Sequence, residues 1–207
     1  MAKVFYEGDS WLIWDPNDIE KLRNEARVIG SATLTAPNFP QQSKFLGLPI
    51  ELTSYEAKWC FENGFCKLVK PIFKDFNSDF PDEILEQNFR KITIRAHDES
   101  EYEIEEIGPP ILDPFKYKVY CDLKQNYWIS DASNYGCDFA IYISPPWECH
   151  SSAFIWCNNE ILDTKKLIQL MRISETARKR LISAHLTPNG NIEYVEFSRY
   201  KSVEDLK

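Results

Sequence analysis

The stretch Asn-Tyr-Gly-Cys-Asp-Phe-Ala-Ile-Tyr-Ile-Ser-Pro-Pro-Trp-Glu-Cys-His, residues 134–150, decides how the C-terminal part of the chain folds. Residues 137–143 are rich in β-branched and aromatic side chains and predict a β-strand. The two prolines at 145 and 146 end that strand, because proline cannot donate to the hydrogen-bond ladder of a sheet. We therefore expect Tyr142 at the margin of a sheet, and His150, eight residues later, in the following loop.

The side chains of this predicted strand alternate between two different faces. The more apolar face carries Cys137, Phe139 and Ile141, whereas the other face carries Asp138, Ala140 and Tyr142. We expect the apolar face to pack on the core, so that Tyr142 points away from it.

The residues around this stretch predict a compact α/β (α+β) domain over residues 111–207. Asp113 followed by proline is typical of a helix start, and this helix would carry Tyr117, Tyr120 and Leu123. Asp163 caps a second predicted helix, which has on one face Leu167, Leu170 and Met171. Further strands are predicted at 127–130, 153–157, 181–186 and 192–200, the last two pairing across the turn Pro188-Asn189-Gly190.

Residues 1–70 predict a smaller α+β domain, with short strands at 4–6 and 10–14. A helix should begin at Pro16, bury Ile19, Leu22 and Ala26, and stop at Gly30. A second helix starts at Thr53, because Glu56 completes a capping box, and it ends near Gly64. Residues 59–61 are expected to face a small core. This domain shows no convergent set of titratable residues, so we expect a structural or assembly role.

The net charge of −8 is concentrated in one segment. Residues 71–110 contain 11 acidic and 4 basic residues, whereas residues 111–207 contain 12 of each. We expect the acidic segment to be a linker, with a short helix near 81–89 and a strand at 91–96. Its Glu-rich run at 99–106 is either a docking strip for a basic partner or, as is commoner, a solvated charge run.

The six cysteines and three histidines form neither a CxxC pair nor a zinc-ligand spacing. We therefore expect reduced thiols in an intracellular protein. Neither a secretion signal nor a membrane span is expected, because the longest apolar run is only a few residues. Cys149 beside His150 does not predict a thiol nucleophile, since a nucleophile and its base must meet in space and adjacent residues rarely do.

A third candidate, Lys179, follows His150 by 29 residues within Arg-Ile-Ser-Glu-Thr-Ala-Arg-Lys-Arg-Leu, residues 172–181. Together with residues 134–150, this segment resembles the catalytic signature of the tRNA-splicing endonuclease family. Residues 45–53 and 64–69 are similar to the N-terminal domain of the family's subunit that cuts the 3′ splice site. The resemblance covers most of the chain and implies a C-terminal catalytic domain with a mixed sheet flanked by helices.

The resemblance implies that Tyr142 is the general base, His150 the general acid and Lys179 the charge stabiliser when RNA is cleaved by its own 2′-hydroxyl. That reaction deprotonates the 2′-hydroxyl, protonates the departing 5′-oxygen and crowds negative charge on the phosphate. Its products are a 2′,3′-cyclic phosphate and a 5′-hydroxyl, with no metal or other cofactor. The implied substrate is intron-containing pre-tRNA, and the implied partners are other endonuclease subunits in a heterotetramer. The implied location is the nucleus, with the cytoplasm or an organelle surface as alternatives.

The resemblance also implies substrate contacts at Arg172 and Arg199. In the family, the corresponding side chains of one subunit sandwich a bulged base at the active site of another subunit. The chain departs from the family pattern at Cys137, at residues 143–146 and at Glu148, where the family often has a glycine, a Pro-Gly-Asp-Pro turn and a basic residue. These departures leave the three catalytic candidates intact and are expected to alter local substrate contacts.

Two other functions compete with this hypothesis. Asp163 and Lys165 resemble one end of a metal-dependent nuclease site, with Asp138 as a second carboxylate, although Asp163 is better explained as a helix cap. The second competitor is a non-catalytic scaffold subunit of the same complex, and the presence of all three catalytic candidates argues against it.

Overall fold

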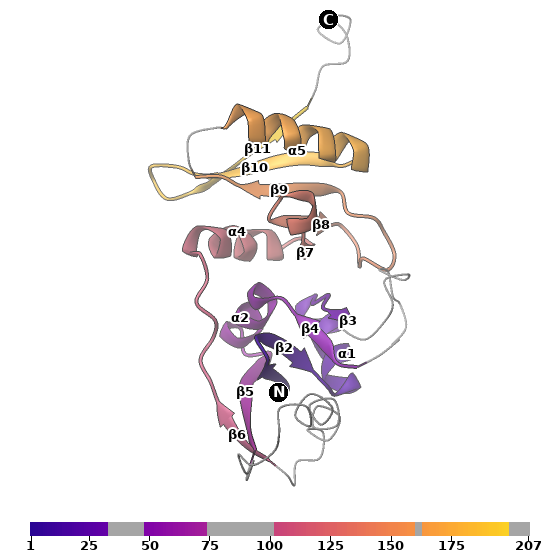
Figure 1. Ribbon diagram of the computed structural model, residues 1–207, viewed down its shortest axis with the longest axis vertical. Helices are drawn as coiled ribbons and strands as arrows, with labels where there is room; N and C mark the ends of the chain where they lie inside the picture. Colours follow the sequence, from indigo (N-terminus) through magenta and orange to yellow (C-terminus); the bar gives the residue numbers. More distant parts are fainter. Residues whose placement is uncertain (33–47, 74–101, 160–162, 199–207) are drawn as a thin grey trace, which may run out of the picture. The chain divides into compact units, whose positions relative to one another are not determined.

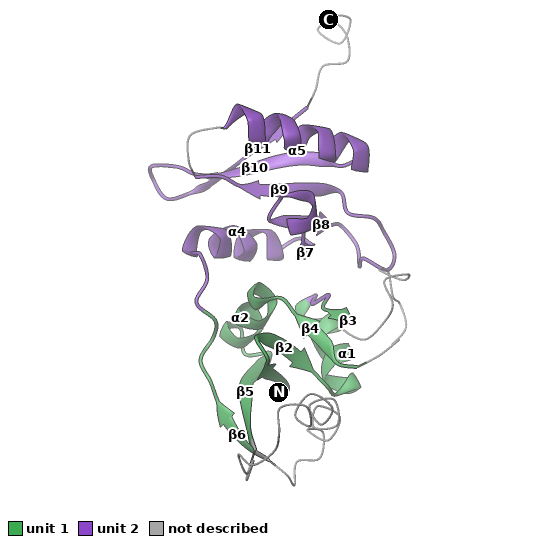
Figure 2. Ribbon diagram, viewed as in Figure 1, with its two compact units in different colours: residues 1–26, 30–36, 45–110 green, residues 27–29, 37–44, 111–207 purple. Residues whose placement is uncertain are grey.

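A computed structural model describes residues 1–32, 48–73, 102–159 and 163–198 of the chain (Figure 1). The chain divides into two compact units, which Figure 2 distinguishes by colour. Unit 1 comprises residues 1–26, 30–36 and 45–110, and unit 2 comprises residues 27–29, 37–44 and 111–207. Each unit combines a mixed sheet with helices, which confirms the predicted α+β class.

Unit 1 contains, within the described residues, a sheet with the strand order β3-β4-β2-β1-β5-β6. β1 and β5 run parallel, and the other neighbours run antiparallel. The strands are β1 (Ala2–Glu7), β2 (Ser10–Ile13), β3 (Ser31–Ala32), β4 (Ile50–Leu52), β5 (Cys66–Phe73) and β6 (Tyr102–Glu106). The helices are α1 (Pro16–Ala26) and α2 (Ser54–Glu62).

Helix α1 buries Ile19, Leu22 and Ala26, as predicted. The predicted stop at Gly30 is wrong, because α1 already ends at Ala26 and the next residue takes a positive φ of 50°. Gly30 is instead required for packing. A Cβ atom there would lie 2.3 Å from Ile50 Cγ2, far inside the usual carbon–carbon separation of about 3.5–4.0 Å.

Helix α2 starts with the predicted capping box. The Thr53 hydroxyl accepts a hydrogen bond from the Glu56 amide at 3.2 Å, and the Glu56 carboxylate accepts one from the Thr53 amide at 3.0 Å. Cys60 is fully buried, but Phe61 is 37% exposed, so the prediction that both face the core is wrong for Phe61. Consecutive helical residues point about 100° apart, so residues 59–61 cannot all face one core.

The segment predicted as a linker, residues 71–110, takes part in the sheet of unit 1 at both of its described ends. β5 extends to Phe73, and β6 pairs with it, with Glu105 opposite Lys70. Residues 71–73 and 102–106 are therefore strand rather than linker, and part of the Glu-rich run forms the edge strand of the described sheet, where charge discourages pairing with another chain. The helix and strand predicted at 81–89 and 91–96 lie outside the described residues.

Unit 2 contains, again within the described residues, a sheet with the strand order β11-β10-β9-β8-β7. β9 and β10 run parallel, and the other neighbours run antiparallel. The strands are β7 (Trp128–Asp131), β8 (Phe139–Tyr142), β9 (Ala153–Cys157), β10 (Arg180–Leu186) and β11 (Ile192–Phe197). The helices are α4 (Pro114–Lys124), the 3-10 turn η1 (Ser133–Tyr135) and α5 (Thr164–Ala177).

The two long helices of unit 2 cover opposite faces of its sheet (Figure 1). On one face, Tyr120 of α4 packs on Phe139 of β8, with ring centroids 5.7 Å apart. On the other face lies a set of buried residues that we call the α5-side cluster: Ala132, Cys137, Ala140, Phe154, Trp156, Leu170 and Leu181. Both helices begin at the predicted caps, Asp113 and Asp163. No helix in the described part of the chain is long and apolar enough to cross a lipid bilayer.

Candidate active site

Tyr142 is the last residue of β8, the strand between β7 and β9. Its hydroxyl lies 3.3 Å from Ser130 Oγ on β7, and Trp128 is its cross-strand partner. The half-buried Tyr142 side chain also packs against the α5-side cluster. The phenol is thus held by a neighbouring strand and by the core beneath α5.

The prediction that Tyr142 points away from the core is wrong. Ala140 and Tyr142 both pack on the α5-side cluster, while Phe139 meets α4 on the opposite face. A strand covered on both faces has no solvent side. Cys137 belongs to the same cluster as Ala140, so the predicted alternation does not extend back to residue 137 but begins at Phe139, where β8 starts.

His150 is exposed and lies in the connection between β8 and β9. The turn before it is closed by the Pro145 carbonyl, which accepts hydrogen bonds from the amides of Glu148 at 2.8 Å and Cys149 at 3.2 Å. The Cys149 thiol donates to the Ser144 carbonyl at 3.2 Å. This thiol therefore supports the turn that leads to His150.

A pair of tryptophans anchors the same connection to the sheet. The ring of Trp147 packs edge-on against Trp128 of β7, with centroids 5.2 Å apart and planes at 77°. At its far end, the Ser152 amide donates to the Ile141 carbonyl at 2.8 Å. His150 thus lies on a short segment that is fixed on both sides, and Trp128 links this segment to the strand that pairs with Tyr142.

Lys179 follows directly after α5. Arg178 caps the helix with a positive φ of 55°, and the Lys179 amide then donates to the Ser174 carbonyl at 2.8 Å. The Lys179 ammonium group donates to the backbone carbonyl of Ser151 at 2.6 Å. Because Ser151 is the residue after His150, this contact joins the lysine to the loop that carries the histidine.

The sheet topology explains why residues so far apart in sequence lie at one edge of the sheet. β8 and β9 are antiparallel, so the end of β8 lies beside the start of β9. β10 runs parallel to β9 with Arg180 opposite Ala153, so these two strands begin at the same edge. Tyr142, the connection through His150, and Lys179 therefore lie at one edge of the sheet.

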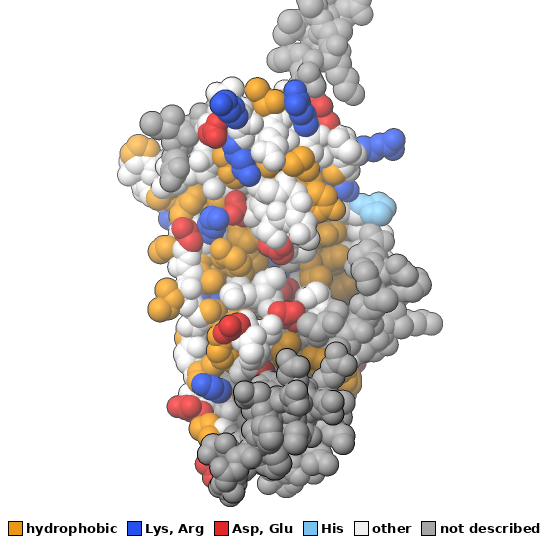
Figure 3. All heavy atoms as spheres, in the orientation of Figure 1, with side chains coloured by type: hydrophobic (Ala, Val, Ile, Leu, Met, Phe, Trp, Pro, Cys, Tyr) orange, Lys and Arg blue, Asp and Glu red, His pale blue; other side chains and the backbone are white. Residues whose placement is uncertain are grey.

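A hollow with a volume of about 520 Å³ opens beside Lys179. Its lining includes Ser151, Arg172 and Lys179, and none of the described residues that line it is acidic. Arg172, which was predicted to contact substrate, is exposed on α5. Lys and Arg side chains are also spread over the region of α5 on the face drawn in Figure 3. The hollow therefore offers positive charge to a ligand.

Arg199 lies outside the described residues, so its substrate contact stays a prediction. Tyr135, which the sequence analysis missed, lines the hollow and is 45% exposed. The sequence signal that could have identified Tyr135 as a site residue is weak. It is only an aromatic residue before Gly136, outside the predicted strand.

Cys137 stands where the family often has a glycine. Its side chain is buried in the α5-side cluster. Burial, together with the negative charge of Asp138, raises the pKa of the Cys137 thiol to about 12. The thiol therefore stays protonated at neutral pH and adds volume to the core. Glu148, by contrast, is exposed two residues before His150.

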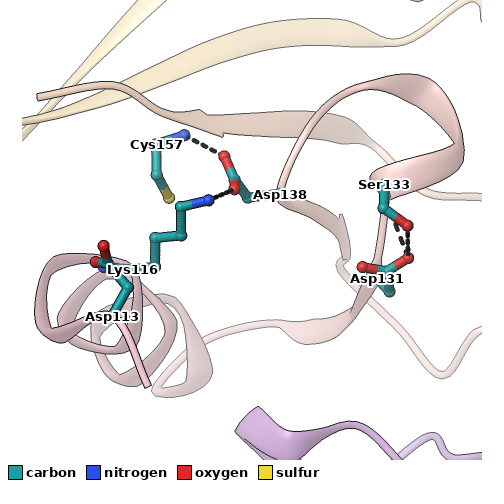
Figure 4. A network of polar contacts seen from close by, with 6 residues as sticks. All are labelled: Asp113, Lys116, Asp131, Ser133, Asp138 and Cys157. Atoms are coloured by element: carbon teal, nitrogen blue, oxygen red, sulfur yellow. Dashed lines mark hydrogen bonds and ion pairs between the residues drawn. The ribbon is translucent and has the colours of Figure 1, made fainter. Parts of the chain in front are cut away.

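The carboxylates considered for a metal-dependent nuclease have other contacts. Asp138 pairs with Lys116 at 2.6 Å and accepts a hydrogen bond from the Cys157 amide at 2.7 Å (Figure 4). Asp163 caps α5 by accepting from the Lys165 amide at 2.9 Å. The described residues contain no group of three or more His, Cys, Asp or Glu side chains suited to a metal ion. The structural roles of these carboxylates do not favour the metal-dependent alternative.

Comparison with known proteins gives two family matches. The family model described as tRNA intron endonuclease, catalytic C-terminal domain, matches residues 114–194 and defines an endonuclease-type domain. This range contains all three catalytic candidates. The model for the TSEN34-like, N-terminal domain matches residues 2–71. The chain belongs to the tRNA-splicing endonuclease family.

One curated relative is similar to part of the chain. A probable tRNA-splicing endonuclease subunit sen34 from Schizosaccharomyces pombe is 35% identical over 66 residues. The similarity covers 32% of this chain and 23% of the relative. The chain therefore matches only a minor part of that protein's length.

Proposed function

We propose that this chain is the endonuclease subunit that cleaves intron-containing pre-tRNA at the 3′ splice site. The observation that carries the proposal is the hydrogen bond from Lys179 to the Ser151 carbonyl, which places a cation beside the His150 loop. Tyr142 ends β8 at the same edge of the sheet. The TSEN34-like domain and the sen34 relative support the choice of this particular subunit.

In the proposed reaction, Tyr142 acts as the general base and takes the proton from the 2′-hydroxyl next to the splice site. The 2′-oxygen then attacks phosphorus, and the bond from phosphorus to the 5′-oxygen breaks. His150 gives its proton to that departing oxygen. The products are a 2′,3′-cyclic phosphate and a 5′-hydroxyl, and the reaction consumes no water and needs no metal.

Lys179 stabilises the negative charge that gathers on the phosphate oxygens. An ammonium group has three N–H donors, so the single bond to Ser151 does not exhaust its capacity. That bond also fixes the direction of the flexible lysine side chain before substrate arrives. A charge held in place in this way is more effective in the transition state than one that must reorganise.

The direct test uses the complex purified through a tag on the full-length chain. We expect it to cut labelled pre-tRNA at the 3′ splice site equally well with and without EDTA. The downstream product should accept phosphate from polynucleotide kinase without prior phosphatase treatment, and the upstream product should carry a cyclic phosphate. Loss of cutting in EDTA that magnesium restores would instead support the metal-dependent alternative.

The same purification tests the proposed partners. Residues 111–207 carry as many acidic as basic residues, so strong binding to tRNA requires positive charge from other subunits. We propose a heterotetramer in the nucleus. Recovery of three other subunits in equal amounts supports this proposal, and a lone monomer contradicts it.

Arg172→Ala is expected to weaken cutting at the 5′ splice site while sparing the 3′ site. The reason is the proposed reach of Arg172 into the active site of another subunit, where its guanidinium plane would stack on a bulged base, together with Arg199. One such contact contributes about 0.5–2 kcal/mol, which corresponds to a loss of roughly two- to thirtyfold. Both sites are assayed separately in the complex. Because Arg172 also lines the hollow beside Lys179, a loss confined to the 3′ site would show action within its own subunit and contradict the proposal.

A further inference from the structure

We propose that the hollow beside Lys179 binds an unpaired base of the RNA, and that Tyr135 is the residue on which this base stacks. The inference rests on the proposed function, because RNA is taken as the ligand. Tyr135 is the last residue of η1, the turn that precedes β8, and it lines the hollow together with Lys179. It would be a substrate-positioning residue beside the proposed active site.

The Tyr135 ring is both exposed and held in place. It stacks on Phe154 of β9, with ring centroids 4.6 Å apart and planes at 24°. Phe154 is only 2% exposed and belongs to the α5-side cluster, whereas Tyr135 keeps 45% exposure. An aromatic ring that is backed by the core and open on its surface is a ready stacking platform, because little freedom is lost when a base binds.

The turn that carries Tyr135 is fixed from both sides. Asp131 accepts a hydrogen bond from the Ser133 amide at 3.1 Å and another from the Ser133 hydroxyl (Figure 4). Gly136 ends the turn at a φ of 73°, and a Cβ atom there would lie 3.3 Å from both Leu170 and Lys166 of α5. The turn therefore sits closely on α5, and only a glycine combines this φ with this spacing.

The surroundings of the ring favour a nucleotide over an apolar partner. Lys179 is part of the lining of the hollow, and none of its described lining residues is acidic. An ammonium group suits a phosphate and an aromatic face suits the base, and this combination is typical of single-stranded nucleic-acid sites. The volume of about 520 Å³ falls within the range of small-ligand pockets, roughly 300–1,000 Å³. A phosphate bound at Lys179 would bring a neighbouring base to this hollow.

The test measures binding and does not depend on cutting. The probe is a single-stranded RNA oligonucleotide that spans the 3′ splice site and carries a 2′-deoxynucleotide at the cleavage position. A series of matched probes lacks one base at each position near that site. We expect the complex to bind one of these abasic probes about five- to a hundredfold more weakly than the intact probe, the usual range for losing one base–aromatic stack.

Two variants locate that loss. Tyr135→Leu should bind the intact probe as weakly as the wild type binds the abasic one, and it should no longer distinguish the two probes. Tyr135→Phe keeps the aromatic face and should behave as the wild type. Thermal unfolding of each variant reports whether the turn has been disturbed.

Two outcomes would overturn the inference, and a third would contradict only the proposed function. A Tyr135→Leu variant that still discriminates against the abasic probe shows that the base binds elsewhere. If the variant is unfolded or loses the other subunits, wild-type complex is cross-linked to 5-iodouridine at the sensitive position, and a cross-link that maps away from Tyr135 and the hollow excludes the site. A complex that discriminates between the probes but does not cut pre-tRNA contradicts the proposed function and leaves the base site intact.

Discussion

His150→Ala is expected to slow cutting at the 3′ splice site by about 10²- to 10⁴-fold, the usual loss when a general acid is removed. The variant should still fold and assemble, because the His150 side chain is exposed and the connection that carries it is held by other residues. Trp147 packs on Trp128 before it, and Ser152 bonds to Ile141 after it. The measurement is a single-turnover rate with saturating complex.

Two controls separate an acid from a residue that only shapes the loop. His185 is half-buried on β10, five residues beyond Arg180 and hence about 17 Å along the strand from the active edge, so His185→Ala should leave the rate unchanged. A substrate with sulfur in place of the departing 5′-oxygen needs no proton to leave. On that substrate, His150→Ala and the wild type should cut at similar rates. An equal defect on both substrates would show that His150 is not the acid.

The helix starts of this fold could be predicted from sequence because they are set by local hydrogen bonds. Thr53 with Glu56, and Asp113 and Asp163, satisfy backbone amides within their own first turns, so their effect does not depend on distant residues. The face of β8 could not be predicted in this way. Whether Tyr142 meets solvent depends on α5, which begins more than twenty residues later, and the sequence near Tyr142 does not specify that covering helix.

β6 was wrongly predicted to be part of a linker because its local composition is misleading. Its residues Tyr-Glu-Ile-Glu-Glu are mostly charged, which is typical of a linker, yet they pair with β5 across a gap of 28 residues. Lys67 forms an ion pair with Glu106, and Lys70 lies opposite Glu105. The partners that make this strand favourable lie on β5, and only the pairing register reveals them.

In the candidate site, too, some features follow from local sequence and others depend on distant residues. The types of the three candidate catalytic residues follow from the family resemblance, but their position at one edge of the sheet depends on topology. β9 and β10 begin at that edge because they run parallel and are joined through the crossover helix α5. The Lys179 contact with Ser151 follows from that arrangement. The proposed role of Tyr135 could not be predicted from the sequence around it. That role depends on the buried Phe154 behind the ring and on helix α5 beside the turn, and neither is near Tyr135 in sequence.

Lys179→Met is expected to lower the single-turnover rate at the 3′ site by about 10²- to 10³-fold, the loss typical of removing one group that stabilises transition-state charge. Methionine keeps most of the apolar stem, so packing around the stem changes little. What is lost is the ammonium group and its hydrogen bond to the Ser151 carbonyl. Lys179→Arg should restore little, because a planar guanidinium does not reproduce a compact ammonium at the same distance from that carbonyl.

Arg180→Ala is the matched control for Lys179→Met. It also removes one positive charge at the start of β10, but from an exposed side chain whose ion pair with Glu196, at 3.6 Å, is of the kind that contributes about 0–1 kcal/mol. If Lys179 acted only through the general attraction of RNA, both variants would weaken substrate binding alike and cut normally once saturated. We expect Arg180→Ala to follow that pattern and Lys179→Met to stay slow at saturation. Equal rates for the two variants with saturating complex would show that the charge of Lys179 takes no part in the chemical step.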